Sequence, residues 1–231
     1  MIQEVLSNWR TASVGDRLHT TLGFLEKLTL TPGKVVPADV ASLRAAGVSE
    51  RAVIDAIYVC VGFNIINRIA DALAFKVPPP KAFAGGVKFL RLFGYKLLSG
   101  SFTGHNDLQR TYLASEGASV ADGAPTPDPY LLMVKRLRES VLDERGTLNL
   151  AVREAATAVA EVPGVVGRYI RKVAQGDYTY IDTDISALRQ EGYSDDQLFE
   201  STVSAALGAG LERRHAGLSA LWGVGPHPLS V

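Results

Sequence analysis

The apolar positions of residues 57–73, IYVCVGFNIINRIADAL, cover most of the circumference of a helix. No proline interrupts the segment, and Gly62 is its one weak helix former. Five positions of the segment are polar or reactive, and at about 100° per residue they fall within about 100° of the helix circumference. So wide an apolar surface predicts an all-α protein, in which one narrow polar seam faces either solvent or an internal cavity. The polar seam consists of Cys60, Asn64, Asn67, Arg68 and Asp71.

A second copy of the segment before this helix occurs later in the chain. Residues 38–56, ADVASLRAAGVSERAVIDA, align without gaps with residues 183–201, TDISALRQEGYSDDQLFES, at an offset of 145 residues. The repeat predicts two diverged helical hairpins. The identical pairs are Asp39/Asp184, Leu43/Leu188, Arg44/Arg189, Gly47/Gly192 and Ser49/Ser194.

Each hairpin has the residues expected at its turn. Gly47 and Gly192 follow a helical segment and are placed to adopt the left-handed conformation of a helix C-cap. Ser49 and Ser194 follow two residues later and are placed to cap the next helix. The expected helices are about 15–29, 50–73, 148–174, bent or broken at Pro163, and 195–221.

A different region joins the two copies. It begins with the stiff segment VPPPKAF, and it is expected to contain helices separated by a loop. We divide the chain into a first repeat (1–76), a helical connector (77–147), a second repeat (148–222) and a tail (223–231). Within the connector we expect helices at 85–98 and 129–144 and a loop at 116–129, and no strand anywhere.

The charge balance argues against several kinds of partner. The chain has 24 basic and 24 acidic residues, so no broad positive surface for nucleic acid or an anionic membrane is expected. The uncharged apolar runs are shorter than a membrane span, and the first ten residues do not resemble a signal peptide. With one cysteine in 231 residues, no intrachain disulfide can form. We therefore expect a soluble cytoplasmic protein.

Residues 24–73 resemble the alkylhydroperoxidase/carboxymuconolactone decarboxylase superfamily, in particular its peroxidase-related branch. The similarity lies in FLEKLT, the DV and LRAAGVS elements, and FNIINRIADAL. The second copy, LRQEGYSDDQLFESTVSAALGAGLERRHAGL, is similar to the same superfamily. This resemblance implies an all-α fold of packed hairpins, homo-oligomers, and a pseudo-dimer within this chain.

The peroxidases of that superfamily use a Cys-x-x-Cys-x-x-x-His motif with an upstream Glu. In the second copy Glu154 matches the Glu, but Val166 and Tyr169 fall at the cysteine positions and Val173 at the histidine. Without two neighbouring thiols, dithiol turnover of peroxides is excluded. The equivalent positions in the first copy are Trp9, Thr21, Phe24 and Leu28.

The polar seam is the one candidate site, and three interpretations of it stay open. It is a solvated strip with an Arg68–Asp71 pair, a buried structural network, or a small cavity. In the cavity, Arg68 binds an anionic group, Asp71 orients it, and the amides donate hydrogen bonds. Because the helix is so apolar, we expect Asn64 and Arg68 to be buried where the two copies join.

The other candidate groups favour structural roles. Cys60 is expected to be a small buried hydrophobe whose pKa is raised, and Tyr178 and Tyr180 are expected to pack against the protein. We predict no cofactor and no metal, because the histidines show no ligand spacing. They are His19, His105, His215 and His227.

Three functions follow as hypotheses. The first is a thiol-independent small-molecule enzyme of the lyase or isomerase type, acting through acid–base or anion-orienting groups. The second is a catalytically silent ligand-binding or assembly protein. The third is a peroxidase-related oxidoreductase acting through Cys60 alone. The expected partners are a small anionic ligand and further copies of the same chain, with no nucleic acid and no membrane.

Overall fold

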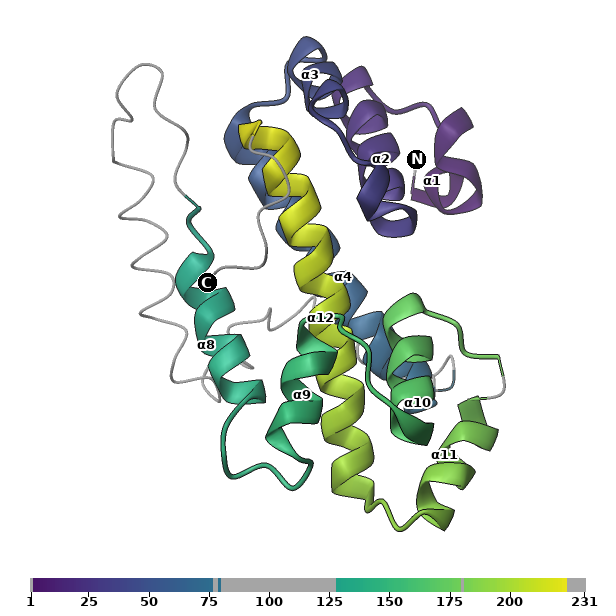
Figure 1. The fold of residues 1–231 in the computed structure, drawn as a ribbon. Helices are drawn as coiled ribbons and strands as arrows, with labels where there is room; N and C mark the ends of the chain where they lie inside the picture. The colour runs from purple at the N-terminus through teal and green to yellow at the C-terminus, as the bar shows by residue number, and fades with distance from the viewer. Residues whose placement is uncertain (1, 77–78, 80–127, 180, 224–231) are drawn as a thin grey trace, which may run out of the picture. The chain divides into compact units, whose positions relative to one another are not determined.

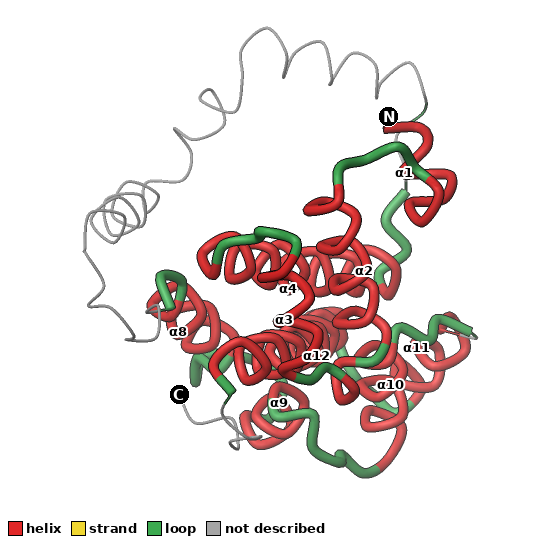
Figure 2. Tube along the Cα trace, turned by 90° about the horizontal axis from the view of Figure 1, so that it is seen from above, coloured by secondary structure: helices red, strands yellow, loops and turns green. Residues whose placement is uncertain are grey.

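The computed structural model describes residues 2–76, 79, 128–179 and 181–223, and within them every regular element is a helix (Figures 1 and 2). The expectation of an all-α protein is confirmed. The expected helix at 85–98, nearly all of the loop at 116–129 and the tail from 224 lie outside the described residues. The helices are α1 (Ile2–Asn8), α2 (Asp16–Leu30), α3 (Pro37–Ala45), α4 (Glu50–Ala72), α8 (Leu131–Val141), α9 (Leu150–Thr157), α10 (Gly164–Gln175), α11 (Ile181–Gln190) and α12 (Asp195–Trp222), with short 3₁₀ helices η1 (Trp9–Thr11) and η2 (Pro32–Lys34).

The chain forms two compact units, which are considered separately. The first combines residues 1–73 with 135–231, and the second contains residues 74–134. Helix α8 crosses the boundary between them. All contacts discussed below lie within the first unit.

Helices α4 and α12 lie side by side and form the centre of the first unit (Figure 1). Their close approach depends on glycine. A Cβ atom at Gly210 would lie 2.7 Å from Cγ1 of Ile65, and one at Gly217 would lie 2.9 Å from Cδ1 of Ile57. The isoleucines of α4 therefore pack against the bare backbone of α12.

Both expected hairpin turns are present. Gly47 and Gly192 adopt positive φ angles of 80° and 88°, which a residue with a side chain rarely adopts. The Ser49 hydroxyl accepts a hydrogen bond from the amide of Ala52, and Ser194 accepts one from Gln197, each at 3.2 Å. These residues end one helix and begin the next as the sequence indicates.

The same ion pairs occur in both hairpins, 145 residues apart. Lys27 binds Asp39 at 2.6 Å, which ties α2 to α3, and Lys172 binds Asp184 at 2.5 Å, which ties α10 to α11. Across the following turns, Arg44 contacts Glu50 at 2.8 Å and Arg189 contacts Asp195 at 2.9 Å.

The helix expected at 148–174 is two helices, α9 and α10. Pro163 caps α10, and the break extends back to the end of α9 at Thr157. Within the break, Val159 has a φ angle of 55°, which is strained for a β-branched residue. The break lets α9 and α10 each pack against α12.

Among the described helices, α4 is long and apolar enough to cross a membrane, with a mean hydropathy of 1.5 in its most apolar window. The uncharged apolar runs of the sequence are shorter than a membrane span, and α4 reaches this length because its window includes charged residues. The core helix of a soluble protein has the same properties, and 44% of this window is buried. Helix α4 also buries an arginine and an asparagine against neighbouring helices, which fits a core helix.

Candidate functional site

A cavity of about 460 Å³ opens beside the polar seam. Its lining comes from α4, the end of α2, the end of α10 with the loop that follows, and α12. All five seam residues line it. The other lining residues are Leu25, Thr29, Leu30, Val59, Phe63, Gln175, Gly176, Tyr178 and Arg213.

The seam has a buried part and an exposed part. Cys60, Asn64 and Arg68 are buried, whereas Asn67 and Asp71 are exposed. The expected burial of Asn64 and Arg68 is therefore confirmed. The helical arc of the seam is wide enough to include both the floor of the cavity and its mouth.

Asn64 connects the buried side chains of the seam. Its Nδ2 atom donates to the carbonyl of Cys60 at 2.9 Å and contacts the Cys60 sulfur at 3.2 Å. Its Oδ1 atom accepts from Nη1 of Arg68 at 2.7 Å. Both ends of the amide are used, so its orientation is determined by its neighbours.

Arg68 is held by oxygen atoms that carry no full charge. Nε donates to the carbonyl of Ala174 at 3.1 Å, and Nη1 donates to the carbonyl of Asn64 at 3.1 Å. Among the described residues no carboxylate lies within ion-pair distance of Arg68, so the Arg68–Asp71 pair of the solvated-strip interpretation is absent. Its Nη2 atom makes no hydrogen bond with any described residue.

Arg213 occupies the matching position on α12, 145 residues after Arg68. Nε and Nη2 donate to the carbonyl of Thr29 at 3.2 and 2.9 Å, and Nη1 donates to the carbonyl of Ala209 at 2.8 Å. Glu212 forms an ion pair with it at 3.1 Å. Burial lowers the pKa of Arg68, and the positive charge of Arg213 lowers it further. Two guanidinium groups thus share one cavity.

Cys60 lies on the floor of the cavity with its sulfur 3.3 Å from the Thr29 hydroxyl. Burial raises the pKa of the thiol, against the opposing effects of Thr29, Arg213, Asn64 and Arg68. The expectation of a buried cysteine with a raised pKa is confirmed. Its position in the cavity agrees with the cavity interpretation of the polar seam.

Tyr178 is a site residue that sequence reasoning missed. It was expected to pack, and it does pack against a buried cluster that includes Tyr169 and Val173, but it also lines the cavity. Burial raises the pKa of its hydroxyl, Arg68 lowers it and Asp71 raises it, so Tyr178 lies in the field of both groups. Thr29 and Arg213 were missed as well, although the 145-residue register already paired Arg213 with Arg68.

Five of the eight positions aligned with the peroxidase motif hold buried core side chains. Val166, Tyr169 and Val173 are buried in the second hairpin, as are Phe24 and Leu28 in the first. The Tyr169 hydroxyl lies 2.6 Å from that of Thr202. Glu154 is exposed. The five buried positions contribute to packing.

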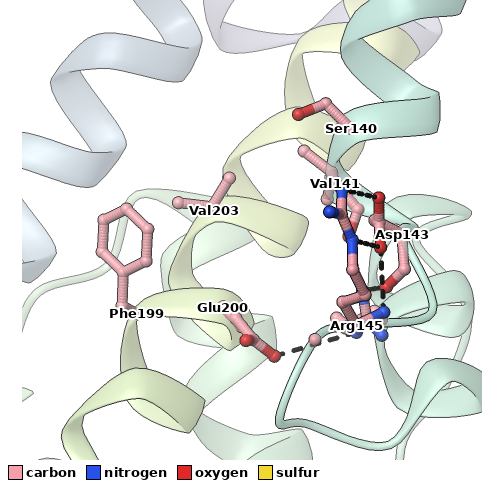
Figure 3. A pocket seen from close by; sticks show the side chains of 9 residues that line it. Ser140, Val141, Asp143, Arg145, Phe199, Glu200 and Val203 are labelled. Atoms are coloured by element: carbon pink, nitrogen blue, oxygen red, sulfur yellow. Dashed lines mark hydrogen bonds and ion pairs between the residues drawn. The ribbon is translucent and has the colours of Figure 1, made fainter.

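A second cavity, of about 530 Å³, lies near the start of the second hairpin (Figure 3). Arg153 is buried there, donates to the carbonyls of Leu148, Val141 and Asp143 at 2.8–3.0 Å, and lies 3.8 Å from Glu200. Glu200 in turn accepts from the backbone amides of residues 147 and 148. Its charged groups are paired within the protein, which indicates a structural role.

No family model, curated protein or solved structure matches the chain. Among the described residues no group of three or more His, Cys, Asp or Glu side chains could hold a metal ion. The case for a function therefore depends on the cavity at the polar seam.

Proposed function

We propose that this chain is a duplicated, alkylhydroperoxidase-like helical protein that binds a small carboxylate in the cavity at the polar seam and acts on it without thiol chemistry. The observation that carries the proposal is the state of Arg68. Arg68 is only 8% exposed and lines the cavity. It has no carboxylate partner among the described residues.

Electrostatics supports an anionic ligand. Arg68 and Arg213 bring two positive charges to one cavity. Among the described residues, Glu212 is bound to Arg213, and Asp71 lines the cavity without an ion pair to Arg68. An anion near Arg68 would offset the repulsion between the guanidinium groups. Nη2 of Arg68 has hydrogen-bonding capacity left for a carboxylate oxygen.

The cavity also contains groups suited to proton transfer. Asp71, at the mouth, is the carboxylate among the lining residues, and Tyr178 is the phenol. We assign proton transfer to these two groups, and orientation of the ligand to Arg68. This arrangement corresponds to a lyase or isomerase type of reaction.

A catalytically silent binding protein is the second candidate, and one observation favours it. Arg68 and Arg213 each bind a carbonyl near the end of the opposite hairpin's helix, so both have a structural reason to be present. Under this alternative the cavity binds its ligand, and neither the wild type nor Asp71→Asn turns it over. Loss of turnover in Asp71→Asn with binding retained would support the enzyme.

The proposal is tested by measuring the melting temperature of the protein at increasing concentrations of acetate, benzoate or phosphate. Chloride at the same ionic strength is the control. We expect a saturable increase with at least one carboxylate, absent in Arg68→Gln and retained in Ile66→Ala, because Ile66 is exposed and does not line the cavity. Because Arg68→Gln could fold poorly, a second measurement uses the wild type alone and follows the rate at which Cys60 is alkylated. Bound carboxylate should slow the alkylation of Cys60 on the cavity floor. No saturable increase and no protection with any carboxylate would refute the proposal.

A further inference from the structure

Three large apolar side chains lie at the mouth of the cavity at the polar seam, in addition to the exposed Asn67 and Asp71, and we call these three the apolar mouth. They are Leu30, Val59 and Phe63, which are 70%, 54% and 62% exposed, respectively. Large apolar side chains are mostly buried in proteins, and those on the surface usually occur singly. Three around one opening form an exposed apolar patch, which is typical of a binding site. They come from the end of α2 and from one face of α4.

The polar groups of the cavity have a definite order. The buried floor carries Arg68 together with the Cys60 thiol and the Asn64 amide. Asp71 is exposed and adds a negative charge. A ligand that reaches Arg68 therefore places its charged end inside and the rest of its body against the apolar mouth.

We infer that the ligand is an amphipathic monocarboxylate, with a carboxylate bound by Arg68 and an alkyl or aromatic body in contact with Phe63, Leu30 and Val59. This inference rests on the proposed function and specifies its ligand. A second negative charge on the ligand would lie near Asp71 and would be repelled. A strongly hydrated body, such as a sugar or a phosphate, would leave the apolar mouth without a partner.

A homologous series of acids tests the inference on the full chain. Calorimetry with acetate, butyrate, hexanoate and octanoate should give a dissociation constant that decreases about twofold to fourfold for each added methylene, because each methylene buries apolar surface. Succinate should bind more weakly than butyrate, although the two have the same number of carbons.

Two variants locate the apolar contact. Phe63→Ala should reduce this dependence on chain length and weaken octanoate about tenfold, with acetate unchanged. Ile66→Ala is the matched control, because Ile66 is 62% exposed on the same helix and does not line the cavity. It should bind the whole series like the wild type.

The outcomes separate this inference from the function on which it rests. Equal affinity across the series, or equal effects of Phe63→Ala and Ile66→Ala, would overturn the inference and leave a small-anion site in place. No binding of any acid would refute the proposed function itself. If Phe63→Ala instead lowers the molar mass in solution without changing octanoate affinity, the apolar mouth is an interface between copies and the inference is wrong.

Discussion

Arg68 donates a 3.1 Å hydrogen bond from Nε to the carbonyl of Ala174, in the last turn of α10. Carbonyls in the last turn of a helix lack an intrahelical partner, and a positive charge there interacts favourably with the helix dipole. Arg213 makes the equivalent bond to the carbonyl of Thr29, in the last turn of α2. Each long helix thus caps the helix that precedes the hairpin turn of the other half of the chain.

The buried part of the seam should contribute strongly to stability. Removing one side chain leaves its partners unsatisfied, at about 1–3 kcal/mol for each group. We expect Asn64→Ala and Arg68→Ala each to lower the melting temperature by about 3–10 °C. Asn67→Ala, on the exposed part of the seam, should change it by less than about 2 °C. Thermal denaturation followed by circular dichroism measures all three. Equal melting of Asn64→Ala and Asn67→Ala would show that the network is not important for folding.

Two helical glycines should respond in opposite directions to alanine. A Cβ atom at Gly208 would lie 2.4 Å from the carbonyl oxygen of Ala156, so the backbone must move. We expect Gly208→Ala to destabilise the protein by about 1–3 kcal/mol. At Gly62 nothing lies within 4 Å of the added methyl group. Gly62→Ala should stabilise α4 by about 0.5–1 kcal/mol. Urea denaturation gives both values, and a destabilised Gly62→Ala protein would contradict the open space beside this residue.

Cys60 should be a weak nucleophile at neutral pH. Burial raises the pKa of its thiol, so less thiolate is present at pH 7 than in a free cysteine. The rate of alkylation by iodoacetamide should have its inflection above the pKa of a free thiol, about 8.5. Arg68→Gln should move the inflection higher, because Arg68 stabilises the thiolate.

The raised pKa of the Cys60 thiol also predicts little peroxidase activity. With hydrogen peroxide or an organic peroxide and a dithiol reductant, turnover should not exceed that of Cys60→Ser. Robust turnover that this substitution abolishes would restore the single-thiol hypothesis.

Stability should depend on pH through Glu200. Burial opposes its ionisation, but the amides of Thr147 and Leu148 bind the carboxylate, and its pKa lies below the usual value. A carboxyl group of lowered pKa stabilises the fold above the pKa of the unfolded chain, about 4.3, and this contribution is lost as the pH falls through the folded pKa. Glu200→Gln should therefore cost about 1–2 kcal/mol at pH 7.

The difference between wild type and Glu200→Gln should shrink below about pH 4, as the carboxylate is protonated. Glu154→Gln is the control, since Glu154 is exposed on α9. A difference that is constant from pH 3 to pH 7 would exclude a role for the charge of Glu200.

The chain is expected to form homo-oligomers, as the resemblance implies. Large apolar side chains outside the cavity at the polar seam are exposed, among them Ile2 at 72%, Leu6 at 75% and Ile66 at 62%. Covering them between copies would stabilise a dimer or trimer. Light scattering at micromolar concentration measures the mass. A value near the 24.7 kDa of one chain would be evidence for a monomer.

The features that the sequence predicted well are those determined by neighbouring residues. Gly47 and Ser49 act locally, and the apolar circumference of α4 was sufficient to predict that Asn64 and Arg68 are buried. Periodicity could not separate the floor of the cavity from its mouth, because both lie within the same arc. It also could not find Tyr178 or Thr29, which reach the site from other segments of the chain.

The packing of Ile65 against Gly210 makes the two halves of the chain complementary rather than interchangeable. These residues stand at the same position in the 145-residue register, and the side chain of one fills the space that the other leaves. A pair of first halves would bring two Ile65 side chains together, and a pair of second halves would place two Gly210 residues opposite each other and leave a void. The contact therefore favours the joining of one first half to one second half, and it disfavours symmetric pairs of either half.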